Sequence, residues 1–145
     1  MVTRLKNFLK ENKLLLGISL WISMYIFAHD YNVCRNRRVY FSNPVPYKTE
    51  EEFLIDLEKE KSKLGLEDVT IVCDDDSSIL GGHCFKKGYK KYLIKFNPHY
   101  KTLLVLKHEM YHVKKYENFS LDDLLDGILL GEYEEWKATN YSLEE

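Results

Sequence analysis

The segment His108–His112, which reads His-Glu-Met-Tyr-His, constrains the fold of this chain more than any other stretch. On an α-helix, residues four apart lie on one face, with Cβ atoms about 5–6 Å apart. Two imidazoles at this spacing can bind one metal ion at about 2.0–2.1 Å. Glu109 lies further round the helix, where it could hold a water bound to the metal and accept its proton. The segment therefore predicts a helix that carries a metal site.

The residues around this segment support a helix that packs on a core. Asn97-Pro98 resembles an N-cap followed by proline at the first helical position, so we expect the helix to run from Pro98 to Tyr116. Its two histidines point away from its apolar stripe, which indicates that they face a cleft. The alternative is a solvated helix face that carries these residues by chance. The stripe consists of Leu103, Leu106, Met110 and Val113.

Length and charge indicate one small domain with an appended segment. The chain has 145 residues and a net charge of −2, and its acidic and basic residues are interspersed, which argues against nucleic acid as a partner. Its three cysteines, Cys34, Cys73 and Cys84, match no zinc-finger spacing and favour a reduced, cytoplasmic protein. Ordinary semi-buried thiols explain them better than a thiolate that occupies the metal.

Residues 1–48 differ in character from the rest of the chain. Leu14–Ala28 is an uncharged run that would span roughly 22 Å as a helix, short of the ~30 Å core of a bilayer. Tilt and snorkelling of the flanking residues could extend it. Basic residues on both sides give no orientation, and no cleavage site for a signal peptide follows.

Three interpretations of this run remain open. It could be a single-pass membrane anchor through residues 14–28, a helix that docks on a groove or on a second copy of the chain, or an inhibitory pro-segment. Asn43–Pro46 predicts a linker, which separates residues 1–48 from a domain at residues 49–145. The protein is therefore expected to be cytoplasmic, and either soluble or membrane-associated.

The chain is predicted to form a small α+β domain at residues 49–145, with about three to four helices and a small three-stranded sheet, preceded by the N-terminal hydrophobic helix. Thr49 is expected to cap a helix that ends at Gly65 and buries Phe53, Leu54, Leu57 and Leu64. The glycines of the second strand suit an edge strand that binds an extended peptide beside the cleft. The expected strands are Val69–Cys73, Gly81–Phe85 and Tyr89–Phe96, joined by turns at Asp74–Asp76 and Lys86–Gly88.

A final helix is predicted to begin at Ser120 and to supply the third metal ligand. Glu132 and Glu135 both fall on its apolar face, whereas Glu134 turns away. Carboxylates on a buried face are costly unless they are paired or bound to metal, so one of the two is the expected ligand. The alternative is that both are exposed near the end of the chain.

Together, His108-Glu109-x-x-His112 and Glu135-Trp136-Lys137-Ala138 resemble gluzincin metallopeptidases. The second element is similar to the E-x-x-A-[DN] motif of CAAX prenyl-protease-type membrane metallopeptidases, with Thr139 in place of the acid or amide. The chain looks most like the minigluzincins, small single-domain counterparts of the catalytic domains of integral-membrane metallopeptidases. The resemblance covers residues 49–141 and is specific only at the two motifs.

The resemblance implies a zinc-dependent metalloendopeptidase that hydrolyses a peptide or protein substrate. His108, His112 and Glu135 would bind zinc, and Glu109 would be the catalytic base and acid. It also implies a latent form blocked by a terminal segment. The oxyanion stabiliser stays open among Tyr111, Tyr133, Tyr141 and His83. The rival hypothesis is a non-catalytic, membrane-associated or oligomeric binding protein whose zinc is structural or absent.

Overall fold

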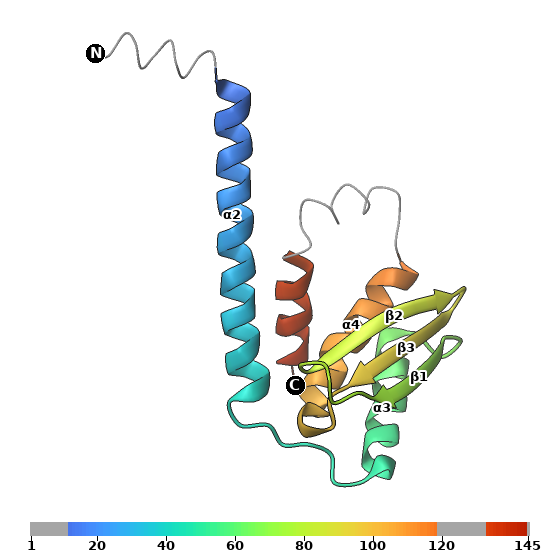
Figure 1. Cartoon of the computed structure of the whole chain (residues 1–145). Coiled ribbons are helices and arrows are strands. Elements are labelled where there is room, and N and C mark those ends of the chain that lie inside the picture. Colours follow the sequence, from blue (N-terminus) through green and yellow to red (C-terminus); the bar gives the residue numbers. More distant parts are fainter. Residues whose placement is uncertain (1–11, 119–132, 145) are drawn as a thin grey trace.

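The computed structural model describes residues 12–118 and 133–144 of the chain (Figure 1). Within them, four α-helices and a three-stranded mixed sheet confirm the predicted α+β class. The predicted start of the final helix at Ser120, and Glu132, lie outside the described residues. The elements are α2 (Lys13–Asn36), a π-helical turn (Arg37–Phe41), α3 (Glu50–Leu64), β1 (Thr70–Asp75), β2 (Gly82–Gly88), β3 (Lys91–Phe96), a 3-10 turn (Pro98–Tyr100), α4 (Leu103–Glu117) and a C-terminal helix at 133–142.

Strand β3 lies in the middle of the sheet, parallel to β1 and antiparallel to β2. Its alternate residues Tyr92, Ile94 and Phe96 are buried, which confirms the predicted alternation. Helices α3 and α4 cover this face, and their apolar residues complete one core (Figure 1). These residues are Phe53, Leu57, Val105, Leu106, Met110 and Val113.

The predicted ends of α3 are confirmed. The Thr49 hydroxyl accepts a hydrogen bond from the Glu52 backbone N–H at 3.1 Å, and Gly65 ends the helix with φ of 67°. Leu54 was expected to be buried but is 49% exposed, because the buried face of α3 is centred on Phe53 and Leu57.

Two predicted turns are wrong. Lys86–Gly88 belongs to β2, and the chain turns at Lys90, which has φ of 50°. Asp74 and Asp75 belong to β1, and only Asp76 begins a turn. In both places main-chain pairing with β3 continues past charged residues, because their side chains stay exposed at the edge of the sheet.

Helix α4 begins five residues later than predicted, at Leu103. The Thr102 hydroxyl accepts a hydrogen bond from the Val105 backbone N–H at 3.3 Å and caps it. The Asn97 side chain caps only the 3-10 turn, since Lys101 has non-helical ψ of 79°. Leu103 is 39% exposed at the first turn and does not join the buried stripe, whereas Leu106, Met110 and Val113 are fully buried.

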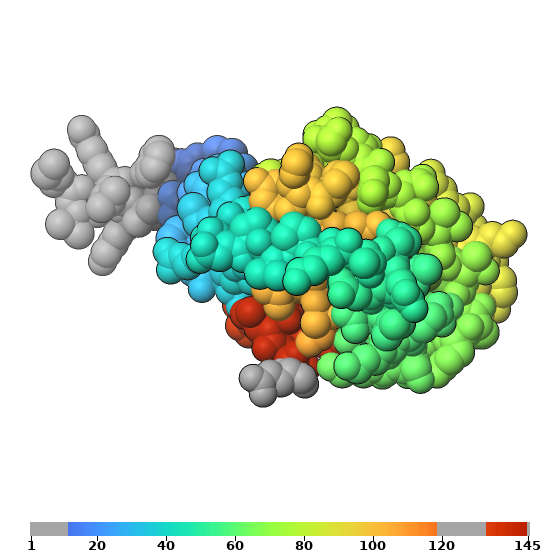
Figure 2. All heavy atoms as spheres, turned by 90° about the horizontal axis from the view of Figure 1, so that it is seen from below, coloured from blue at the N-terminus to red at the C-terminus, as the bar shows by residue number. Residues whose placement is uncertain are grey.

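The last part of the N-terminal segment packs against the rest of the domain. Tyr40, in the π-helical turn, is 5% exposed and belongs to the core. The end of α2 contacts the C-terminal helix, where Thr139 Oγ1 lies 2.7 Å from Asn36 Oδ1 and Arg35 donates to the Trp136 carbonyl oxygen at 3.3 Å. The segment after α2 crosses the underside of the molecule to α3 (Figure 2).

The remainder of α2 projects from the domain (Figure 1). Its apolar side chains are exposed from Leu14 to Phe27, the latter at 75%. The stretch Lys13–Phe41 is long and apolar enough to cross a membrane, with mean hydropathy of 1.3, and none of its most apolar window is buried. This finding rests on length and composition and leaves open an anchor or a signal sequence.

Candidate metal centre

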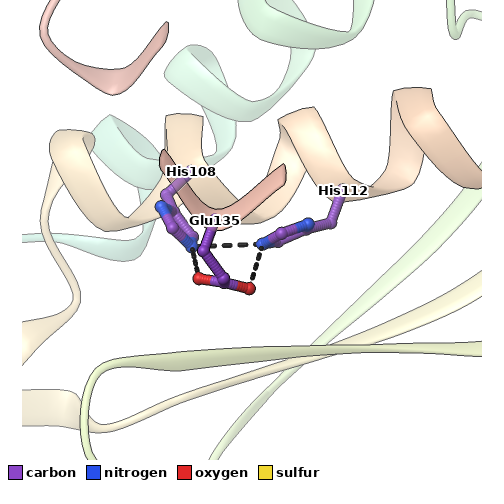
Figure 3. Close-up of side chains that lie close together, drawn as sticks. All are labelled: His108, His112 and Glu135. Carbon is purple, nitrogen blue, oxygen red and sulfur yellow. Dashed lines mark hydrogen bonds and ion pairs between the residues drawn. The ribbon is translucent and has the colours of Figure 1, made fainter. Parts of the chain in front are cut away.

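His108, His112 and Glu135 converge at one point between α4 and the C-terminal helix (Figure 3). The two Nε2 atoms lie 3.1 Å apart. Glu135 Oε2 lies 3.3 Å from His108 Nε2, and Oε1 lies 3.3 Å from His112 Nε2. The structure thus brings together the two histidines of the α4 motif and a carboxylate that is far from them in sequence.

The geometry of this cluster fits a small divalent cation. Ligand atoms that bind zinc at about 2.0–2.1 Å in tetrahedral geometry lie about 3.3 Å from one another. The nitrogen–nitrogen and nitrogen–oxygen separations of 3.1–3.3 Å match that spacing. The donor set, two imidazole nitrogens and one carboxylate, is the one found in catalytic zinc sites that keep a fourth position open.

The electrostatics of the cluster also favour a cation. Two neutral imidazole nitrogens that face each other with their lone pairs repel, so their contact needs a proton or a cation between them. Burial would raise the pKa of Glu135, but its hydrogen bonds with the two rings hold that pKa well below its ordinary value. Burial would lower the pKa of His112, but the hydrogen bond to Glu135 and the charge of Glu109 raise it. The carboxylates of Glu109 and Glu135 therefore favour a positive charge at the two histidines, either a proton or a metal cation.

Glu109 is the second buried acid beside the cluster, at 5% exposure. Burial raises its pKa, and the charges of His108 and His112 act in the opposite direction. A carboxylate with a raised pKa accepts a proton more readily than a solvated one. Its ligand atoms are not part of the converging set, so its position suits a proton acceptor better than a metal ligand.

A cavity of about 340 Å³ opens onto these residues. Its walls come from β2 and α4, and from the end of α2 with the π-helical turn. Among the four residues considered as oxyanion stabilisers, only His83 lines it. Tyr111 and Tyr141 instead reach Glu134 and Glu60, and Tyr133 stacks on Trp136.

Gly82 sets the position of Glu109. A Cβ atom at Gly82 would lie 2.7 Å from both Cγ and Oε1 of Glu109, closer than side chains can approach. The glycine therefore allows β2 to lie directly against the acid. Sequence reasoning assigned Gly82 only to an edge strand.

We expect Gly82→Ala to leave the metal content unchanged and to lower the peptidase activity that the two motifs predict by about 10²-fold, since a displacement of about 1 Å costs that much at a catalytic group. Elemental analysis and peptide cleavage would measure the two effects. Gly88→Ala is the matched control, because Gly88 lies in the same strand and a Cβ atom added there would meet nothing within 4 Å. Equal activity of the two variants would contradict a positioning role for Gly82.

Tyr40 is the site residue that sequence reasoning missed. Its hydroxyl lies 2.8 Å from Nδ1 of His108 and 2.9 Å from Oγ of Ser142. It therefore contacts the ring nitrogen of His108 on the side opposite the cluster. The only sequence signal was an aromatic residue close to the predicted linker, which does not point to a histidine 68 positions away.

Other residues considered for the site lie outside the cluster. Glu134 faces Lys115 and Lys137, at 3.7 and 3.3 Å. Cys84 lines the cavity, but burial raises the pKa of its thiol to about 12, which disfavours the thiolate that binds metals. Thr139 is fully buried and contacts Asn36 rather than either histidine.

Comparisons of the chain with protein-family models, with curated proteins and with solved structures found no match.

Proposed function

We propose that the protein is a zinc-dependent metalloendopeptidase of the gluzincin type. The single observation that carries this proposal is the convergence of His108, His112 and Glu135, with ligand atoms at most 4.8 Å apart, beside a buried Glu109. The resemblance to minigluzincins at the two motifs points in the same direction. The decisive experiment is peptide cleavage that requires both bound zinc and Glu109.

His108, His112 and Glu135 would hold the metal. Zinc, when bound, supplies a Lewis acid that polarises the scissile carbonyl and makes water a nucleophile near neutral pH. Glu109 would accept the proton of the attacking water and then donate it to the leaving amine. The buried position of this carboxylate favours the transfer, because burial makes it a stronger proton acceptor.

A peptide substrate would lie along β2. This strand is at the edge of the sheet and lines the cavity with Gly82, His83 and Cys84. An edge strand offers unpaired main-chain groups to an extended peptide, which would then cross the cluster next to Glu109. His83 would be the group on β2 best placed to stabilise an oxyanion, because it is exposed at the cavity.

Helix α2 would anchor this catalytic domain in a membrane. Its apolar side chains are exposed on all sides from residue 14 to residue 27, which is costly in water. The uncharged run at residues 14–28 spans roughly 22 Å, so tilt and the flanking residues of the helix would complete the crossing of a hydrocarbon core of about 30 Å. The basic residues Arg35, Arg37 and Arg38 would then lie at the surface of the bilayer.

The anchoring proposal predicts that the variant Leu20→Asp, Met24→Asp leaves the membrane fraction. These side chains are 64% and 65% exposed, so the domain itself tolerates the change. Each aspartate at the centre of a span costs about 2.5–3.5 kcal/mol on insertion. Separation of cell extracts by centrifugation after an alkaline wash would test it. Leu20→Ala, Met24→Ala is the control and should stay with the membrane.

Residues 2–28 can be removed to test whether this segment inhibits the enzyme. We expect the shortened chain to retain zinc and to cleave peptides at an unchanged rate, because none of the described residues 12–28 lines the cavity. Removal of residues 1–45 would be a poor test, since it would also remove Tyr40. A clear rise in cleavage by the shortened chain would instead support a pro-segment.

The rival function is a membrane-associated or oligomeric binding protein without catalysis. The exposed apolar surface of α2 favours it, because peptide hydrolysis does not need such a helix. Cleavage that Glu109 does not influence, or a chain that takes up no zinc, would favour this rival over the peptidase.

A further inference from the structure

We infer that Tyr40, supplied by the N-terminal segment, is a positioning residue that fixes the tautomer of His108. The inference rests on the proposed metal site but concerns a contact outside it. Neither motif contains this residue, and the position that follows the second motif, Thr139, does not reach a histidine. The support that His108 receives therefore comes from a different part of the chain.

Three hydrogen bonds in series link His108 to the backbone carbonyl of Thr139 through Tyr40 and Ser142. Because a carbonyl can only accept, it fixes the direction of each bond. The Ser142 hydroxyl donates its only proton to the Thr139 carbonyl oxygen at 2.7 Å. Its oxygen can then only accept from the Tyr40 hydroxyl, 2.9 Å away. The Tyr40 oxygen in turn accepts the Nδ1–H of His108 at 2.8 Å. The Thr139 hydroxyl also lies within hydrogen-bonding reach of Tyr40, and it donates to Asn36 Oδ1 at 2.7 Å.

In the neutral ring this order leaves Nε2 of His108 without a proton, so that in the metal-free protein it accepts the Nε2–H of His112, 3.1 Å away. Nε2 is the nitrogen that faces His112 and Glu135, so these hydrogen bonds leave a lone pair of His108 directed at the cluster. The Tyr40 and Ser142 side chains are both buried, which limits competition from water for these bonds. Outer partners of this kind orient the ring and raise its affinity for metal. In this protein the hydroxyl that does so lies next to the helix that would enter the membrane.

Tyr40→Phe removes one hydroxyl and keeps the ring in the core. We expect the dissociation constant for zinc, measured by competition with a chelator on the full chain in detergent, to rise about 10–100-fold. We also expect the tautomer of His108 to change in the metal-free protein. It would be observed at alkaline pH, where the histidine rings are neutral. Nitrogen NMR of ¹⁵N-histidine-labelled protein should show His108 with its proton on Nδ1 in the wild type, and a shift toward Nε2–H in the variant.

Two further variants make the test specific. Tyr47→Phe removes another tyrosine hydroxyl from the same part of the chain, one that bonds Asp56 at 3.1 Å, and should change neither quantity. Ser142→Ala leaves Tyr40 in place but removes the acceptor of its proton, so Tyr40 can donate to Nδ1. Ser142→Ala should therefore also shift the His108 proton toward Nε2. It serves as the test variant if Tyr40→Phe does not fold.

An unchanged tautomer of His108 in Tyr40→Phe or in Ser142→Ala would overturn the inference, even if zinc binding weakened. An unchanged zinc affinity with a shifted tautomer would overturn its link to the metal. Failure of the proposed function looks different, because a wild-type chain that binds no zinc would still show whether Tyr40 sets the tautomer.

Discussion

Glu135→Ala is expected to abolish stoichiometric zinc binding while the wild-type chain holds about one zinc. The carboxylate supplies one of three ligand atoms and lies 3.3 Å from each histidine Nε2. Removal of an outer-shell partner alone costs about 10–100-fold in affinity, so loss of a direct ligand should cost more. The measurement is zinc per chain by elemental analysis after dialysis.

Glu134→Ala is the matched control, because it removes the neighbouring carboxylate of the same helix. Glu134 pairs with Lys115 and Lys137 on another face and should leave the zinc content unchanged. A metal content that falls equally in both variants would indicate damage to the helix. Glu132→Ala belongs in the same series, since the sequence alone does not separate it from Glu135. No zinc in the wild type, even after incubation with the metal, would remove the basis of the peptidase proposal.

Glu109→Gln is expected to keep zinc and to lose peptide cleavage by about 10²–10⁴-fold, which corresponds to about 3–5 kcal/mol in the barrier. Glutamine has nearly the same shape and cannot accept the proton. The fold should tolerate it, because burial already disfavours the charged form of Glu109. The assay would use a mixture of fluorogenic peptides with varied sequences, since the substrate is not specified by the site.

Zinc content must be measured on the same sample, so that a lost metal is not mistaken for a lost base. Glu134→Gln provides a glutamate-to-glutamine change outside the cavity and should remain active. Full cleavage by Glu109→Gln would exclude the assigned role of this residue. Loss of zinc together with activity would instead indicate that Glu109 helps to hold the metal.

Local features of the fold could be predicted from the sequence. The cap at Thr49, the end of α3 at Gly65 and the alternation along β3 are confirmed. Each depends on residues within a few positions of one another. The cap is one local hydrogen bond, the helix end is one left-handed backbone conformation, and the strand alternates buried and less buried residues with a period of two. Predictions were wrong where main-chain pairing overrode local signals, as in the turn at Lys86–Gly88.

The sequence by itself determined the histidine pair, since residues four apart on a helix share a face in any fold. It also determined the long apolar helix, through composition alone. Only the tertiary structure decided that Glu135 meets those histidines, that Gly82 lies against Glu109 and that Tyr40 supports His108. These contacts join residues far apart in the chain, and they form only when several elements pack on one core. No short-range pattern of residue types records such distances.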